Sequence, residues 1–367
     1  MLSFAPAGTK PAANLDPFTT AEIAALFAPL VGLRGALLAV SGGPDSVAMM
    51  LLAATWAETS KVKLAVATVD HGLRDGSRAE AEAVATWAQA LGLPHRILTW
   101  DGEKPVTAIQ ERAREARYDL LFRYAEEIGV DHLLTAHHAD DQAETILFRF
   151  LHGSGIAGLA GMQVATQHGE ITHLRPFLAY PKEALVGVCA SRGQAFFRDP
   201  SNEDSSFART RLRRLLRLLA EEGITRQALL RLGRRAARAE FALAAFTRIL
   251  RGSLHGTQKS GQFCAAIGHL RDAPEEIMLR LVAHEIEACG GGNVRLERLE
   301  SLLEGLRAAL HAGASWRGTL AGMRLALSDE GILTIAAEKP RRRGIRGAST
   351  DRPSPQAGDV KGGGPSG

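Results

Sequence analysis

The sequence has few cysteines and no long apolar run, and both absences narrow the classes of protein it can belong to. Cys189, Cys264 and Cys289 lie far apart and form no C-x-x-C pair, which argues against a zinc site, an iron–sulfur cluster and a disulfide framework. No apolar run reaches the roughly 18 residues of a membrane span, and the N-terminus lacks a basic start followed by an apolar core. We therefore expect a globular protein of the reducing cytoplasm without a membrane partner.

Two common phosphate-binding loops are absent, although a glycine loop is present. The apolar stretch Ala36–Val40 predicts a strand buried on both faces of a parallel sheet, and Ser41-Gly-Gly-Pro-Asp-Ser46 follows it. A Walker A loop has a lysine after its last glycine, and a dinucleotide loop reads G-x-G-x-x-G; this loop matches neither. A glycine turn before a helix still favours an anion, because the unpaired amides and the helix dipole attract phosphate. An ordinary strand-to-helix turn explains the loop taken alone equally well.

Up to residue 204, short apolar stretches alternate with segments whose apolar residues recur at helical spacing. After a loose lead-in over residues 1–20, residues 21–204 predict a doubly wound α/β domain with a mainly parallel, five-stranded sheet. Asp70 and His71 follow the second strand, at the carboxyl edge where open α/β sheets bind their ligands. The five predicted strands are Ala36–Val40, Lys63–Val69, His95–Trp100, Asp131–Ala136 and Glu170–Leu174.

Histidines and acidic residues follow the fourth predicted strand. His138, Asp140, Asp141 and Glu144 lie at the start of a predicted helix, whose positive end favours Asp140 and Asp141. A well-capped helix with spare histidines explains them as well as a catalytic site does. No third soft ligand lies nearby, which disfavours zinc. Carboxylates beside a phosphate loop commonly bind Mg²⁺, which prefers oxygen ligands and bridges phosphates.

Two arginines lie together on the predicted helix Thr107–Ile128. Arg114 and Arg117 share one face of it. Such a pair is either a solvated surface paired with Glu111 or Glu115, or a pair of phosphate ligands.

The composition changes after residue 204. Residues 205–251 hold twelve Arg and no Lys against three Glu, an excess of nine positive charges, whereas the whole chain carries +4. Because these arginines recur on helical periods with Leu and Ala, we predict basic helix faces that bind a nucleic-acid backbone rather than merely solvated faces. Residues 205–338 are predicted to form a smaller, mostly helical domain ending in a β-hairpin. Residues 339–367 are rich in Arg, Gly, Pro and Ser, and we expect them to be disordered.

The glycine loop resembles the SGGxDS loop of the ATP pyrophosphatases, or PP-loop proteins, with their adenine-nucleotide α-hydrolase-like fold. Further segments, in the same order, resemble the tRNA(Ile)-lysidine synthase family. They are Val69-Asp-His-Gly-Leu-Arg74, Ala113-Arg-Glu-Ala-Arg-Tyr118, His138-Ala-Asp-Asp-Gln-Ala-Glu-Thr145, Gly153–Met162, Arg175-Pro-Phe177 and Asp199-Pro-Ser-Asn202. Arg209-Thr-Arg-Leu-Arg-Arg214 departs from the family's usual Arg-Asn-Arg-Ile-Arg, and the extra C-terminal domain of longer members is missing.

This resemblance implies a ligase that uses ATP and Mg²⁺ to join free L-lysine to the wobble cytidine of tRNA(Ile) with a CAU anticodon. The cytosine O2 would attack the α-phosphate of ATP and release pyrophosphate. The lysine amine would then displace AMP at C2. The tRNA would be a partner and DNA would not, and a homodimer is compatible with the sequence.

The resemblance also implies roles for individual residues. The loop residues Ser41, Gly42, Gly43, Pro44, Asp45 and Ser46, with Asp70 and His71, would bind ATP. Asp45 and Asp141 would hold Mg²⁺, Arg114 and Arg117 would neutralise phosphates or stabilise the adenylated base, and His138 and Glu144 would line the pocket where base or lysine reacts. The predicted tRNA-binding residues are Arg209, Arg211, Arg214, Arg234, Arg235 and Arg238.

Two other classes stay open at this point. One is a different adenylating enzyme on the same loop, either a tRNA thiolase or a small-molecule amide ligase. The missing C-x-x-C pair weighs against the thiolase, and the Arg-rich helices weigh against the amide ligase. The other is a non-catalytic nucleotide-binding module, which would not require the acidic cluster after His138.

Overall fold

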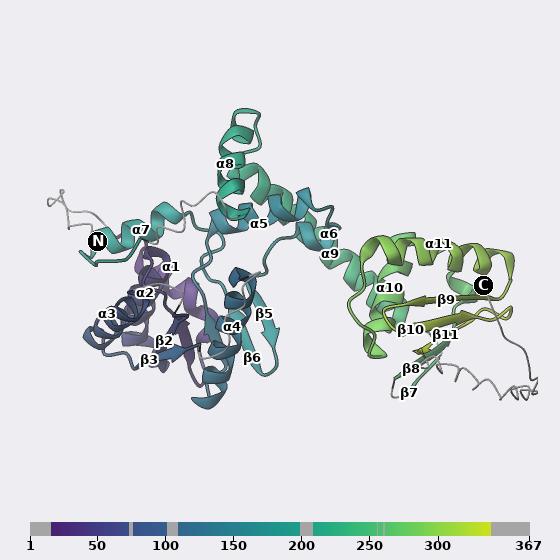
Figure 1. The fold of residues 1–367 in the computed structure, drawn as a ribbon, viewed down its shortest axis with the longest axis horizontal. Helices are drawn as coiled ribbons and strands as arrows, with labels where there is room; N and C mark the ends of the chain where they lie inside the picture. Colours follow the sequence, from purple (N-terminus) through teal and green to yellow (C-terminus); the bar gives the residue numbers. More distant parts are fainter. Residues whose placement is uncertain are drawn as a thin grey trace, which may run out of the picture. The chain divides into compact units, whose positions relative to one another are not determined.

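The structure of the protein is a computed structural model that describes residues 16–72, 76–100, 109–198, 208–254, 256–259 and 261–338. It divides into two compact units, Met1–Ala245 and Phe246–Gly367 (Figure 1). The predicted polar turn after Arg198, most of the predicted lead-in and the predicted tail lie outside the described residues. In the described part of the chain, no helix has both the length and the apolar character needed to cross a membrane.

The first unit contains a mainly parallel sheet with the strand order β3-β2-β1-β4-β6-β5. Five strands run parallel, and β5 pairs antiparallel with β6 at the edge. The predicted doubly wound α/β fold is confirmed, but the sheet has six strands rather than five. The sequence of β5, Ala-Thr-Gln-His, has no apolar pattern and is mostly exposed, so hydrophobicity could not reveal it. The strands are β1 (Ala36–Ala39), β2 (Leu64–Asp70), β3 (His95–Thr99), β4 (His132–Leu134), β5 (Ala165–His168) and β6 (Ile171–Leu174).

Helices cover both faces of this sheet (Figure 1). Successive residues of β1 point to opposite faces, so that Leu38 packs with one core cluster and Leu37 with the other. The cluster around Leu38 includes side chains of α1 (Thr20–Phe27), α2 (Pro44–Ser60), α3 (Ser77–Ala90) and α7 (Lys182–Ser191). The cluster around Leu37 is closed by Leu121, Phe122 and Ala125 of α4 (Ile109–Glu127). Burial on both faces explains the uninterrupted apolar sequence of β1.

Two Arg-rich helices pack on this unit. Leu212 of α8 (Ala208–Glu221) and Leu229 of α9 (Arg226–Gly252) share a core cluster with α5 (Ala139–Leu151). At Gly233 of α9 an added Cβ would lie 2.5 Å from Ile146 Cδ1, which shows how closely the two helices approach. We predicted that the second domain begins at residue 205, whereas the two compact units divide after Ala245, inside α9. The apolar side of the basic helices causes this difference, because it packs against α5.

The second unit has an antiparallel sheet with the order β7-β8-β11-β10-β9. Leu303 and Leu306 of one helix and Val282 of another are buried in the core of this unit. The predicted hairpin lies within β9, β10 and β11. The sheet also contains β7 and β8, which were not predicted because their sequences are short and mix polar with apolar residues. The prediction of a mostly helical domain over residues 205–338 thus missed a five-stranded antiparallel sheet in its second half. Its elements are β7 (Gly256–Lys259), β8 (Gln262–Ala266), α10 (Glu275–Ala288), α11 (Leu296–Ala312), β9 (Trp316–Leu320), β10 (Met323–Leu327) and β11 (Ile332–Ala337).

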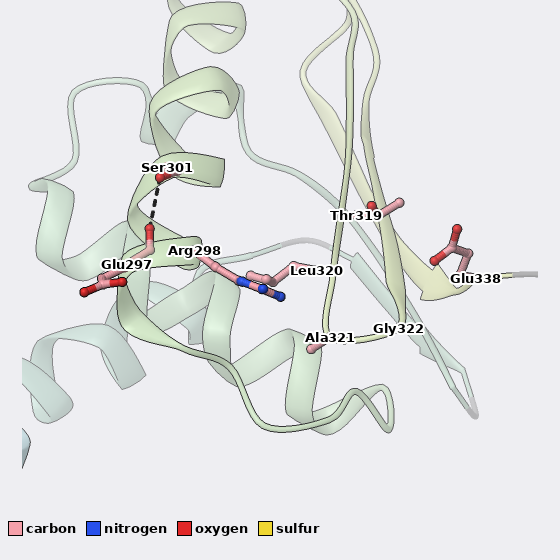
Figure 2. A pocket seen from close by; sticks show the side chains of 8 residues that line it. All are labelled: Glu297, Arg298, Ser301, Thr319, Leu320, Ala321, Gly322 and Glu338. Carbon is pink, nitrogen blue, oxygen red and sulfur yellow. Dashed lines mark hydrogen bonds between the residues drawn. The ribbon is translucent and has the colours of Figure 1, made fainter.

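A pocket in the second unit lies between the first turns of α11 and the β9–β10 turn (Figure 2). Its lining combines the acidic Glu297 and Glu338 with the basic Arg298. Ser301 donates a hydrogen bond to the backbone oxygen of Glu297 at 3.0 Å, a contact within one helix turn. This mixed lining favours no class of ligand over another.

Candidate active site

The glycine loop connects β1 to α2 and is shaped by its own serines. The Ser41 amide donates to Ser46 Oγ at 3.1 Å, and Ser46 Oγ donates to the Gly43 carbonyl at 3.0 Å. Gly42 has φ of +85°, and a Cβ there would lie 2.8 Å from the Phe197 ring, so both backbone and space require glycine. The N-cap of α2 is Gly43, which offers no side-chain cap. The loop therefore presents a helix N-terminus of the kind that binds anions.

Asp45, His138 and Asp141 come together at the carboxyl ends of β1 and β4. His138 Nε2 lies 3.6 Å from Asp45 Oδ2 and 3.5 Å from Asp141 Oδ2. Asp45 Oδ1 is buried and has no hydrogen-bond partner among the described residues. Within the same residues, no three His, Cys, Asp or Glu side chains form a group able to hold a metal ion. Two carboxylates with an unsatisfied oxygen still fit Mg²⁺, which takes one or two protein carboxylates and completes its shell with phosphate and water.

His138 caps the helix that carries the acidic cluster. Its Nδ1 accepts from the Asp141 amide at 3.4 Å, and Asp141 Oδ2 accepts from the His138 amide at 3.2 Å, which makes a reciprocal capping box. Burial lowers the pKa of His138, but the hydrogen bond to Asp45 and the negative charges of Asp141, Asp45 and Asp140 outweigh burial. The pKa is therefore raised from its ordinary value. The ring therefore lies between the carboxylates of Asp45 and Asp141 with a raised pKa.

Asp140 joins three helices next to this cluster. Its Oδ2 accepts from the Lys182 amide at 3.0 Å, and its Oδ1 accepts from Arg226 Nη1 at 2.7 Å. Lys182 also places Nζ 3.7 Å from Asp45 Oδ2. Sequence reasoning missed Lys182 and Arg226, because each simply begins a helix distant along the chain.

Glu144 forms an ion pair that sequence reasoning also missed. Its carboxylate accepts from Arg213 Nε of α8 at 2.6 Å. The Glu144 side chain is only 7% exposed, whereas that of Arg213 is 33% exposed. Burial lowers the pKa of Arg213, yet the bond to Glu144 and the charges of Glu144, Asp141 and Asp45 raise it. Arg213 belongs to the Arg-rich segment that we assigned to RNA, and this contact places it beside the acidic cluster instead.

Arg114 and Arg117 of α4 face one aromatic ring. Each guanidinium carbon lies 5.2 Å from the centre of the Tyr118 ring. Glu115 was one of two acidic residues with which a solvent-exposed Arg114 or Arg117 could have paired. It pairs instead with Arg112, at 3.4 Å. The two arginines thus contribute a positive field on the side of the sheet edge that bears His137. Their assignment to phosphates stays a prediction.

Asp70 lies at the expected edge of the sheet, where its carboxylate accepts hydrogen bonds from residues that follow it in the sequence. Its Oδ1 accepts from Ser77 Oγ at 2.7 Å and from the Gly72 amide at 2.9 Å. Burial raises the pKa of Asp70, but these two bonds together with the charges of Arg78 and His71 outweigh it, and the pKa is lowered. His71 lies edge-on to Trp100, with ring centres 6.1 Å apart. A role of either residue in nucleotide binding stays a prediction.

The predicted tRNA-binding arginines are on α8 and α9. The side chains of Arg211, Arg214, Arg234, Arg235 and Arg238 are exposed, and that of Arg209 lies outside the described residues. Their role in binding a phosphate backbone stays a prediction.

Comparisons with known proteins point to one family. A family model described as the PP-loop domain matches residues 15–219. A tRNA(Ile)-lysidine synthase of Methylobacterium sp. (strain 4-46) is 48% identical over 336 residues, covering 89% of this chain and 97% of that protein. Another, from Methylobacterium nodulans, is 50% identical over 316 residues, covering 84% and 92%. The solved U34-tRNA thiolase NcsA from Methanococcus maripaludis matches 59% of this chain and 77% of its own, at 16% identity and a TM-score of 0.50, which is a likeness of fold alone.

Proposed function

The chain belongs to the tRNA(Ile)-lysidine synthase family, and we propose that it joins free L-lysine to C2 of the wobble cytidine of a tRNA(Ile) with a CAU anticodon. The reaction consumes ATP and releases AMP and pyrophosphate, which makes the protein a ligase that forms a carbon–nitrogen bond. The observation that carries the proposal is the meeting of Asp45 from the glycine loop with His138 and Asp141 from α5. A nucleotide-binding module alone has no use for this acidic cluster.

The glycine loop is the proposed site for the phosphates of ATP. Gly43 leaves the N-terminus of α2 uncapped by a side chain, which supports binding of pyrophosphate oxygens by backbone amides. Asp45 and Asp141 would hold Mg²⁺, and the unpartnered Asp45 Oδ1 supports this assignment. When bound, the ion would neutralise charge on the phosphates. Arg114 and Arg117 would add positive charge from α4.

The chemistry proceeds in two balanced steps. In the first, the cytosine O2 forms a bond to the α-phosphorus of ATP, and the bond from that phosphorus to the bridging oxygen breaks to release pyrophosphate. In the second, the lysine amine bonds to C2, the C2–O bond breaks to release AMP, and the amine gives up a proton. Both steps depend mainly on positioning and on stabilisation of charge.

The acidic cluster suits the second substrate. Glu144 and Asp141 are carboxylates on successive turns of α5, and a cationic lysine is the amino acid that such a cluster would attract. His138, beside them, is the candidate for moving the amine's proton.

The RNA would contact the basic helices. The exposed Arg211, Arg214, Arg234, Arg235 and Arg238 supply charge for its phosphates, while the wobble base leaves its stack to reach the site.

The dependence of ATP consumption on tRNA tests the proposal against its rivals. We expect AMP and pyrophosphate only when the isoleucine tRNA is present. A small-molecule ligase would release AMP with its own substrate and without tRNA. A binding module would consume no ATP at all, and release of ADP would contradict the proposed chemistry.

A further inference from the structure

Four polar side chains form a hydrogen-bonded chain between β4 and β6, apart from the acidic cluster. Arg175 Nη2 lies 2.9 Å from His173 Nδ1. His173 Nε2 lies 2.8 Å from Thr135 Oγ1, and Thr135 Oγ1 lies 2.7 Å from His137 Nδ1. Thr135, His137 and His173 are all buried. The mechanism above uses none of the four.

The donor and acceptor atoms of these four side chains allow hydrogen bonds to be donated in one direction only, from Arg175 towards His137. A guanidinium only donates, so His173 Nδ1 must accept, and the proton of a neutral His173 is on Nε2. That proton is donated to Thr135 Oγ1, whose hydrogen bonds among the described residues go to His173 and His137 alone. The Thr135 hydroxyl therefore donates its own proton to His137 Nδ1. His137 is left with its proton on Nε2, for which the described residues offer no acceptor.

Both histidines are held neutral. Burial lowers the pKa of His137 to about 2, and the charges of Arg114, Arg175 and Arg117 and the nearby His173 add to the shift. Burial, followed by Arg175, Arg114, Arg117 and His168, lowers the pKa of His173 to about 3. His137 thus differs from its neighbour His138, whose pKa is raised. It is therefore an uncharged hydrogen-bond donor at neutral pH.

We propose that His137 donates its Nε2–H to a phosphate oxygen of the bound nucleotide, and that Arg175, His173 and Thr135 are positioning residues that hold this tautomer. This inference rests on the proposed function and adds binding residues to it. A phosphate is the ligand indicated, because His137 lies at the carboxyl end of β4, in the positive field of Arg114 and Arg117. A neutral donor among cations needs no counter-charge of its own and keeps its proton when an anion arrives.

The tautomer is measured directly by ¹⁵N–¹H NMR of histidine side chains in the full-length protein, with His137→Gln identifying the resonance. We expect the proton of His137 on Nε2, a neutral ring from pH 6 to 8, and a downfield shift of that proton when ATP is added. A proton on Nδ1, a charged ring, or no response to ATP would overturn the inference. None of these readouts requires turnover, so they separate this inference from the proposed function.

Removal of the linking hydroxyl tests the positioning chain. Thr135→Val keeps the shape and should lower the rate of AMP formation by about 10- to 100-fold, less than the roughly 10²–10³-fold loss of a donor outright. Its His137 should also populate the Nδ1–H form. Thr135→Ser restores the hydroxyl and should rescue most of the activity. Thr172→Val on β6 removes a hydroxyl that bonds Gln167 instead, and it should keep the wild-type rate. Wild-type AMP formation by Thr135→Val would refute the role of the chain.

Discussion

From the ion pair between Arg213 and Glu144 we predict that removal of Arg213 destabilises the protein more than neutralisation of Glu144 does. The two side chains meet at 2.6 Å, with Glu144 7% and Arg213 33% exposed. Arg213→Ala leaves a carboxylate buried without its cation, which costs about 3–5 kcal/mol for a fully buried pair. Because water can follow the partly exposed Arg213 into the gap, we expect the lower end, about 3 kcal/mol. Glu144→Gln keeps an oxygen that accepts from the same guanidinium and should cost about 1 kcal/mol.

Urea unfolding followed by tryptophan fluorescence measures this difference. Three of the four tryptophans, Trp56, Trp87 and Trp100, belong to the unit that contains the pair. Arg214→Ala, the neighbouring exposed arginine, is the matched control and should change the unfolding free energy by no more than about 0.5 kcal/mol. The double variant Arg213→Ala with Glu144→Gln should recover about 2 kcal/mol relative to the sum of the single changes. Equal losses from Arg213→Ala and Arg214→Ala would refute the reasoning.

Three further predictions concern the nucleotide, the RNA and acid stability. Asp45→Asn should lower AMP formation by about 10²–10³-fold with unchanged melting; wild-type turnover would show that Asp45 only supports the loop. The affinity for tRNA should fall with salt concentration, with a log–log slope of about −0.7 to −0.9 per phosphate neutralised. Changing Arg234, Arg235 and Arg238 together to Gln should make this slope shallower and leave ATP binding intact. An unchanged slope would show that the RNA contacts other residues. The lowered pKa of Asp70 means that its charge stabilises the folded state above the unfolded pKa of about 3.9, and that this contribution is lost as the pH falls through the folded value. Asp70→Asn should therefore lower the unfolding free energy by about 1–2 kcal/mol at pH 7 and progressively less below about pH 4; a constant difference across that range would contradict the assignment.

Local pattern predicted the parallel sheet and the loop, because their determinants are adjacent in the sequence. A strand buried on both faces must be apolar throughout, as Ala36–Ala39 is, and a turn with φ of +85° needs a glycine such as Gly42. His138, Asp141 and Asp45 could be placed at one edge because each follows a parallel strand. The observed separations of 3.5 and 3.6 Å agree with that placement.

Long-range contacts could not be predicted in the same way. Lys182 and Arg213 reach Asp45 and Glu144 from helices that begin far along the chain, and no local spacing encodes either pair. The edge strand Ala165–His168 pairs through its backbone, which leaves no apolar signature. The basic helices were assigned to a separate domain because their charge dominates their composition, although Leu212 and Leu229 pack on α5.

Incorporation of labelled lysine tests the central claim most directly. The purified protein is incubated with ATP, Mg²⁺, labelled L-lysine and an unmodified isoleucine tRNA transcript with a CAU anticodon. We predict that label enters this tRNA, with AMP and pyrophosphate formed in equal amounts, and that elongator methionine tRNA, which shares the anticodon, is a poor substrate. Equal labelling of both tRNAs, formation of ADP, or no label in either tRNA would contradict the account.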